Sequence, residues 1–167
     1  MIPRIERVDD KQIRVSGLNP LMTDSLQRLD EILARRDAPA AHDRLFPTPS
    51  TEAKINAEWE QFVTPELRHL FVSAGDTVVR DLTTLGPDPA QLNQFQVQFP
   101  AAHLEAWISA LNQARLILGA QFAVTEPDMT RQDLDPRQAR DIGLLRIYLL
   151  GYLLQLFIEF TAGESAA

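Results

Sequence analysis

The stretch that decides the fold is Ile142–Phe160, which reads IGLLRIYLLGYLLQLFIEF and holds only three frankly polar residues, Arg146, Gln155 and Glu159. A run of this length suits a buried core helix, the seam of an oligomer or a membrane anchor. The positions of the polar residues must decide among these interpretations. No other part of the chain carries an obvious signature of chemistry.

The polar residues of this run are ordered on the helix. At 100° per residue, Tyr148, Tyr152, Gln155 and Glu159 fall on one longitudinal stripe. Arg146 points to nearly the opposite side, among leucine and isoleucine residues. The helix is therefore amphipathic, although tyrosine rings, which count as apolar, hide this in a simple hydropathy tally.

A tail anchor is the membrane alternative for this helix. On an insertion scale, Arg146 and Glu159 would each cost roughly 2.5–3.5 kcal/mol at the bilayer centre, and each leucine, isoleucine or phenylalanine gains only about 0.3–0.6 kcal/mol. Gly143, Gly151 and Gln155 lower the net gain further. We therefore expect no membrane insertion but a central core helix, with one side open to a homodimer seam.

The region before this helix predicts a small antiparallel sheet. Apolar residues flank the turn-like Asp9-Asp10-Lys11 and predict a hairpin within residues 1–17. Phe95, Val97 and Phe99 alternate with glutamines and predict a half-buried strand at 94–99. An isolated hairpin is marginally stable, so we expect this strand to pair with it and complete a sheet of about three strands.

Helical periodicity accounts for most of the remaining chain. Residues 20–85 predict three helices, whose apolar positions run over 22–33, 55–63 and 67–85, with Pro20 and Pro65 suited to first turns. Ser50 or Thr51 is expected to cap the second helix and Thr64 the third. Residues 37–50, with three prolines, and the acidic segment 124–135 are expected to be loops. Residues 101–162 predict two helices that form a C-terminal core and end at Gly163.

These elements predict a single domain over residues 1–167. Its fold class is mainly α (α+β): a domain of five helices, in which four surround the apolar C-terminal helix, with the small antiparallel sheet beside them. We expect Trp59 and Trp107, which both lie on apolar helical stripes, to pack in the core.

Composition excludes several classes of function. The net charge of −7 argues against a nucleic-acid partner and against anionic lipid surfaces, since both require concentrated positive charge. The absence of cysteine excludes disulfides, thiol catalysis and thiolate metal sites. The charged N-terminal segment 1–6 lacks the apolar core of a signal peptide. A cytoplasmic protein is therefore expected.

No catalytic or metal-binding motif is present. His42, His69 and His103 are scattered, and the chain has no HExxH, no calcium-binding DxDxDG loop, no glycine-rich phosphate loop and no GxSxG elbow. Paired carboxylates lie in expected turns or on polar faces. The sequence therefore predicts no catalytic residue, no metal and no cofactor, and it favours a protein that is not an enzyme.

One polar cluster does stand out. Arg115 lies between Leu111 and Leu118 on the core-facing stripe of its helix, and an unpaired buried charge is costly, so it needs an acceptor. Glu159 is the expected carboxylate. The hypothesis is a partly buried cluster of Asn112, Arg115, Tyr148, Tyr152, Gln155 and Glu159. It is either a structural ion pair that sets helix register or a ligand pocket in which Arg115 or Arg146 binds an anion.

Two segments resemble a known family. LNQARLILG at 111–119 and YLLGYL at 148–153 are similar to the LN-x-x-R-L-x-L-G and Y-x-x-LG-x-L helices of DUF2017, a bacterial family of unknown function. The resemblance is clearest over 101–160 and weaker over 45–85. Many members read LG-x-LQE in the final helix, whereas this chain has Leu154-Gln155 after Leu153.

The resemblance implies a cytoplasmic, mainly helical domain without an established activity. Members are often encoded near the adaptor of the Clp protease, which implies a protein partner linked to Clp proteolysis. We therefore expect a non-catalytic, adaptor-like interaction domain. The competing expectation is a small-molecule or anion-binding module, or an enzyme, centred on Arg115 and the stripe of Tyr148, Tyr152 and Glu159.

Overall fold

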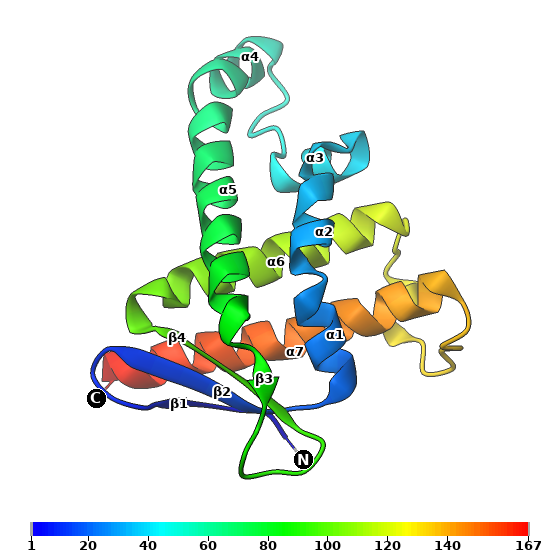
Figure 1. The fold of residues 1–167 in the computed structure, drawn as a ribbon. Coiled ribbons are helices and arrows are strands. Elements are labelled where there is room, and N and C mark those ends of the chain that lie inside the picture. The colour runs from blue at the N-terminus through cyan, green and yellow to red at the C-terminus, as the bar shows by residue number, and fades with distance from the viewer. Residues whose placement is uncertain (1, 167) are drawn as a thin grey trace.

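A computed structural model describes residues 2–166, which form seven α-helices and a four-stranded antiparallel sheet (Figure 1). The predicted fold class, mainly helical with a small antiparallel sheet, is confirmed. In chain order the elements are β1 (Arg4–Arg7), β2 (Gln12–Leu18), α1 (Pro20–Gln27), α2 (Leu29–Leu33), α3 (Pro39–Leu45), α4 (Ala53–Phe62), α5 (Thr64–Asp81), β3 (Gly86–Pro87), β4 (Phe95–Pro100), α6 (Leu104–Gln121) and α7 (Ala139–Ala166).

The sheet has the strand order β1-β2-β4-β3, so the predicted hairpin and the strand at 94–99 do pair. Asp9 makes the turn, because its Oδ1 accepts hydrogen bonds from the backbone N–H groups of Lys11 and Gln12. Ile13 lies opposite Phe99 in the register, and all four apolar residues of this face, Ile13, Val15, Val97 and Phe99, are buried. The strand β3, only two residues long, was not predicted, since so short a segment carries no alternating pattern.

A register shift between β2 and β4 lies between Val15 and Leu18. Gly17 occupies it with a φ of +71°, a left-handed conformation that glycine adopts without steric cost. A side chain here would also meet the carbonyl oxygen of Ile2, 3.1 Å from the position of a Cβ. The bulge therefore requires glycine.

The helix count differs from the prediction in the N-terminal third. The expected helix over 22–33 is divided at Arg28, whose ψ of 2° ends α1 and starts α2. The expected loop over 37–50 contains α3, whose first turn holds Pro39 and whose inner face buries Ala41 and Leu45. Proline at a first helical position starts a helix without loss of a hydrogen bond. The interpretation of Pro39 as a loop signal is therefore wrong.

Helix ends also depart from the prediction at three points. At the start of α1 the prediction is confirmed, because Pro20 is the first helical residue and the Asn19 side chain accepts from the N–H of Met22. By contrast, the residues before α4 and α5 make no side-chain cap, and Thr64 is already helical. The helix α7 continues through Gly163 instead of ending there.

The core lies where α6 and α7 pack along each other and meet the sheet (Figure 1). Phe99 of β4, Trp107 of α6 and Phe157 of α7 are each at most 1% exposed. Their rings stack with centroids 4.7 Å (Phe99–Trp107), 5.6 Å (Trp107–Phe157) and 5.9 Å (Phe99–Phe157) apart. Trp107 is thus a core residue, as predicted.

By its length and composition alone, the helix α7 could cross a membrane. In the fold, its leucine face is covered instead by α6, α1 and β1. Leu144, Leu150 and Leu153 are at most 1% exposed. A core position therefore accounts for the leucine face of α7, whereas Tyr152 and Ile158 of the same helix are 40% and 45% exposed.

The helices α4 and the first half of α5 project from the body as an arm, at the top of Figure 1. No residue of α4 is buried, and the buried residues of α5, Gly75, Val78 and Asp81, all lie in its second half. The prediction that Trp59 packs in the core was wrong, because this side chain is 36% exposed. The amphipathic spacing predicts the helix α4 correctly, but it does not reveal that no other element covers the apolar face of this helix.

Candidate functional site

The residues of the predicted polar cluster are dispersed over α6 and α7. Asn112 and Arg115 do lie together, on the wall of an open pocket of about 310 Å³ that residues of α3, α6, α7 and the segment 124–129 line. Gln155 and Glu159 lie elsewhere and hydrogen-bond to each other at 2.9 Å on the exposed side of α7. The cluster as predicted is not formed.

The predicted ion pair between Arg115 and Glu159 is wrong. No carboxylate among residues 2–166 forms an ion pair with Arg115, whose guanidinium lies over Gly151, with Nε 3.1 Å from the position of a Cβ there. Glu159 is eight residues further along α7, about 12 Å by helical rise. Arg115 of α6 therefore meets α7 at Gly151, about two helical turns before Glu159.

Arg146 has a structural partner instead of a ligand. Its Nη2 donates to Asp24 Oδ2 of α1 at 2.7 Å, and the pair is continued by Arg28, which also contacts Asp24. The Arg146 guanidinium is the main cause that lowers the pKa of Asp24, so the carboxyl stays ionised to more acidic pH. This contact ties α7 to α1.

The two tyrosines of the predicted cluster, Tyr148 and Tyr152, also lie in different surroundings. The Tyr148 hydroxyl donates to the backbone oxygen of Asp128 at 3.2 Å, in the segment that precedes α7. Tyr152 is 40% exposed and points away from the core. Neither tyrosine hydrogen-bonds to Arg115, because Tyr148 contacts the segment before α7 and Tyr152 is exposed to solvent.

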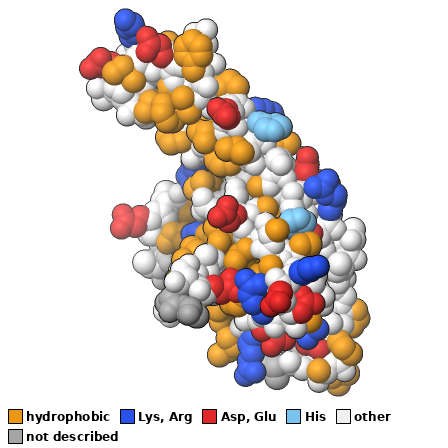
Figure 2. Space-filling model, turned by 90° about the vertical axis from the view of Figure 1, so that its left-hand side faces the viewer, with side chains coloured by type: hydrophobic (Ala, Val, Ile, Leu, Met, Phe, Trp, Pro, Cys, Tyr) orange, Lys and Arg blue, Asp and Glu red, His pale blue; other side chains and the backbone are white. Residues whose placement is uncertain are grey.

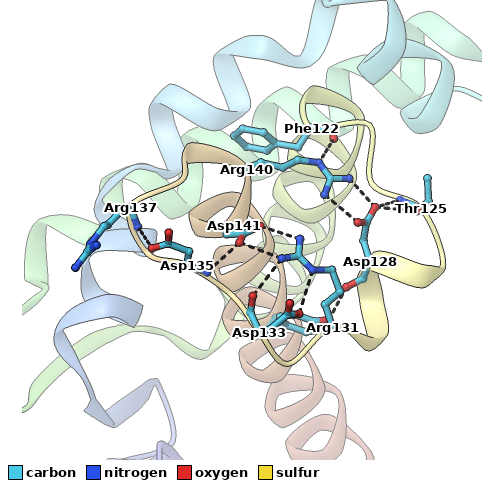
Figure 3. Close-up of polar contacts among 10 residues, drawn as sticks. Phe122, Thr125, Asp128, Arg131, Asp133, Asp135, Arg137, Arg140 and Asp141 are labelled. Atoms are coloured by element: carbon cyan, nitrogen blue, oxygen red, sulfur yellow. Dashed lines mark hydrogen bonds and ion pairs between the residues drawn. The ribbon is translucent and has the colours of Figure 1, made fainter.

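Sequence reasoning missed a network of ion pairs at the start of α7 (Figure 3). Asp128 accepts from Arg140 Nη1 and Nη2 at 2.8 and 2.6 Å and from the backbone and hydroxyl of Thr125. Asp141, which is 2% exposed, accepts from Arg131 and from the backbone N–H of Asp135. The two pairs fasten the segment between α6 and α7 to the first turn of α7.

The pKa values of this network follow from its hydrogen bonds. The Arg140 guanidinium, with Thr125, holds the pKa of Asp128 far below its usual range. The backbone N–H of Asp135 and then Arg131 lower the pKa of Asp141. In return, the carboxylates raise the pKa values of Arg140 and Arg131. All four groups are charged near neutral pH and pair with each other, which suits a structural role and leaves no free acid or base.

Sequence reasoning also missed two buried polar groups, which connect α5 and the segment between α2 and α3 to α6. Asp81, which is 8% exposed, accepts from Trp107 Nε1 at 2.9 Å, and both its oxygens lie 3.0 Å from His103 Nδ1. Arg36, which is 9% exposed, donates to Gln113 Oε1, whose amide in turn donates to the Phe71 carbonyl oxygen. Burial is the main cause that lowers the pKa of Arg36. Both groups satisfy buried polar atoms.

The described residues contain no group of three or more His, Cys, Asp or Glu side chains that could hold a metal ion. Two features stand out as candidates for function, the pocket at Arg115 and the surface of the arm. On the arm, Ile55, Trp59, Phe62 and Leu70 are 43%, 36%, 68% and 57% exposed. Figure 2 shows hydrophobic side chains gathered over this projecting part of the molecule.

The apolar residues of α4 share one face. Ile55, Trp59 and Phe62 stand at i, i+4 and i+7, the spacing of a helical stripe. A hollow of about 180 Å³ opens between α4 and the segment 42–49, and Phe46, Pro47 and Trp59 line it together with polar residues such as Asn56 and Glu60. The arm therefore offers an apolar ridge with a recess beside it.

The rim of this apolar face is acidic. Four exposed glutamates, Glu52, Glu58, Glu60 and Glu66, stand on the arm, against Lys54 as an exposed base of α4. The nearby Arg68 is neutralised by an ion pair with Asp37. The arm therefore combines an apolar face with a negative border.

Comparison with known proteins gives a family and no function. No curated protein and no solved structure matches the chain. The profile of a family described as a domain of unknown function, DUF2017, matches residues 15–161, a span that includes every helix up to most of α7. Because that match covers most of the chain, the protein belongs to the DUF2017 family.

Proposed function

We propose that this protein is a non-catalytic interaction domain that binds a partner protein through the arm formed by α4 and the first half of α5. The observation that carries the proposal is the exposed apolar face of α4, where no residue is buried. Exposed contiguous apolar surface costs free energy in water and in soluble monomers often marks an interaction site. The rest of the domain, held by its core and ion pairs, serves as the base from which the arm projects.

The chemistry of the arm specifies the kind of partner. An apolar face with an acidic border fits a partner segment that presents apolar side chains flanked by lysine or arginine. A second copy of this chain would place two acidic borders opposite each other, and like charges at an interface are unfavourable. The proposal is therefore a different protein, with the recess at Trp59 receiving one of its apolar side chains.

The expected setting is the cytoplasm. The burial of the leucine face of α7 in the core supports this setting, and the net charge of −7 supports a protein partner over nucleic acid or anionic lipid. The adaptor-like role with a Clp-linked partner rests on the family resemblance alone. It makes the Clp adaptor the first purified protein to test against the arm.

The test is site-specific photo-crosslinking in the native host. A benzophenone amino acid is placed at Phe62, and the matched control carries it at Leu92, which is 92% exposed and lies outside the arm. We expect a heterologous adduct at position 62 and none at 92. Mass spectrometry of the adduct should locate it beside a segment with apolar and basic residues.

Each other outcome contradicts the proposal. No adduct at position 62, or the same adducts at both positions, would remove the arm as a docking surface. An adduct of the chain with itself would identify a homodimer and reject the different partner. Because both replaced side chains are exposed, neither substitution should prevent folding.

A further inference from the structure

The pocket at Arg115 lies outside the arm and has the dimensions of a small-ligand site. Its volume of about 310 Å³ is at the lower end of the range typical for such sites, roughly 300–1,000 Å³. Its polar side carries Arg44, Asn112 and Arg115, and its apolar side includes Leu116, Met129 and Ile147. Ligand pockets commonly combine an apolar wall with a few convergent polar groups.

Arg115 is the unusual member of this pocket. It is half-buried, its Nε is buried without a hydrogen-bond partner among the described residues, and no carboxylate of residues 2–166 pairs with it. By contrast, Arg131, Arg140 and Arg146 of the same region are each paired with an aspartate. Only Nε of Arg115 is buried, so the terminal nitrogens of the guanidinium remain available to an anionic partner from outside the chain.

Arg44 brings a second cation to the same place. Its Nη2 lies 3.4 Å from the Val124 carbonyl oxygen, and no carboxylate of the described residues pairs with it. Two guanidinium groups on one small pocket repel each other, and an anion between them would relieve the repulsion.

Glycines on two helices make room for these arginines. Arg44 Nη1 lies 2.6 Å from the position that a Cβ of Gly119 would occupy, and Arg115 Nε lies 3.1 Å from that of Gly151. Glycine within a helix destabilises it relative to alanine. A side chain at Gly151 would press on the half-buried Arg115, whereas the exposed end of Arg44 could move away from a side chain at Gly119.

The remaining charge in the pocket restricts the ligand. Glu126 also lines it but forms no ion pair with either arginine within the described residues. Its carboxylate opposes a second negative charge on a ligand. The wall of Leu116, Met129 and Ile147 favours a ligand with an apolar body over a bare inorganic ion.

We propose that this pocket binds a small organic acid with one negative group, which Arg115 and Arg44 hold through charge-assisted hydrogen bonds while its apolar part packs against Leu116 and Ile147. Asn112 supplies a further amide group at the polar side. This site is separate from the arm, so its existence does not depend on the proposed interaction function.

The experiment is an NMR titration of the ¹⁵N-labelled full chain with three probes at constant ionic strength: benzoate, benzamide and orthophosphate. Benzamide has the shape of benzoate without the charge, and orthophosphate has charge without an apolar body. We expect saturable shifts of the Gly119 and Thr125 amides with benzoate, and at least tenfold weaker binding of the other two probes.

Variants assign the binding to the pocket. Arg115→Met should weaken benzoate binding about tenfold or more, and Arg44→Met should weaken it several-fold, about three- to tenfold. Glu126→Gln should tighten it, by about two- to threefold, because a like charge is removed. The matched control is Arg80→Met on α5, which changes the net charge equally and should leave binding unchanged.

Several results would overturn the site. These are equal binding of benzoate and benzamide, shifts that do not saturate, or a loss in Arg80→Met as large as in Arg115→Met. Preferential binding of orthophosphate would replace the organic acid by an inorganic anion and reject the proposed ligand class. If Arg115→Met fails to fold, Arg44→Met and Glu126→Gln decide the question, because both of those side chains are exposed.

Discussion

At the scale of the residue, the charges of this chain mostly serve to fasten segments together. Asp128 and Asp141 hold the loop before α7 against its first turn, and Asp24 holds α7 to α1 through Arg146. Each of these carboxyls has a lowered pKa because its ionised form accepts hydrogen bonds from an arginine or a backbone N–H. The stability of the loop is therefore linked to pH.

Asp128→Asn tests this linkage. The folded-state pKa of Asp128 lies below its ordinary value of 3.8, so ionisation stabilises the fold above about pH 4, and this contribution is lost as the pH falls further. We expect the wild type to exceed the variant in free energy of unfolding at about pH 7, and the difference to shrink towards about pH 2. Urea unfolding followed by circular dichroism measures both.

The control for this prediction is Asp30→Asn, an exposed aspartate of α2 with no arginine hydrogen bond. Its effect should be small at all pH values, because a surface substitution away from any network changes little. If Asp128→Asn were as stable as the wild type at neutral pH, the ion pair with Arg140 would contribute nothing to the fold.

At the scale of the element, α7 is defined by what its neighbours place against it. Gly143 faces the ring of Phe122, Gly151 faces Arg115, and Gly163 faces open space. The three glycines lie within one helix, yet the surroundings give each a different role. Helix propensity alone treats them as equal.

A pair of substitutions separates these roles. Gly143→Ala gains about 1 kcal/mol in helix propensity but forces a Cβ into the Phe122 ring, and overpacking costs about 1–3 kcal/mol, so we expect net destabilisation. Gly163→Ala meets no atom within 4 Å and should be neutral or stabilising by up to about 1 kcal/mol. Thermal unfolding by calorimetry measures both variants.

The sign of the difference decides this prediction. A Gly143→Ala protein that melts above the wild type would show that Phe122 moves aside freely, and that close packing at this point does not limit α7. A destabilised Gly163→Ala would show that the end of α7 requires the conformational freedom of glycine.

At the scale of the whole molecule, the chain divides into a packed body and an arm with no covering layer. The body unites the sheet, α6 and α7 around Phe99, Trp107 and Phe157, whereas α4 buries none of its residues. Local unfolding requires least free energy where few apolar contacts are lost. The arm should therefore open more readily than the body.

Hydrogen exchange measured by mass spectrometry tests that difference. We expect amides of α4 to exchange with far less protection than those of α6 and α7, which should approach the protection of global unfolding. Protection of α4 equal to that of α6 in dilute, monomeric protein would contradict the exposed arm. If protection of α4 rises on addition of the partner captured at Phe62, the two observations support each other.

Much of the fold was predictable because periodicity is a property of one segment. The alternation at Phe95–Phe99, the turn at Asp9 and the stripe of Leu104–Leu118 each identify an element and its buried side. The exceptions were local as well: Arg28 divides a helix, and Pro39 begins one where a loop was expected. Neither residue decides the structure by its type, because an arginine can also continue a helix and a proline can also lie in a loop.

The candidate sites were predictable only in part. Asn112 and Arg115 were singled out because a guanidinium on a core-facing stripe is unusual, and both do line a pocket. Arg44 could not be added to them, since it lies 71 positions before Arg115 in the chain, on a helix that the sequence predicts to be a loop. The ion pairs of Asp128 and Asp141 depend on how the segment between α6 and α7 folds back onto α7, and the spacing of residues along the chain does not predict this.

The sequence by itself determined the helical class, the antiparallel sheet and the central place of Ile142–Phe160, because each follows from the pattern of apolar residues within one element. Only the tertiary structure decided that Arg115 lies over Gly151 and not beside Glu159, and that the apolar face of α4 stays open. The physical reason is the same in both cases. The face of a helix is set by its own periodicity, but what that face meets is set by the axial position and direction of other elements.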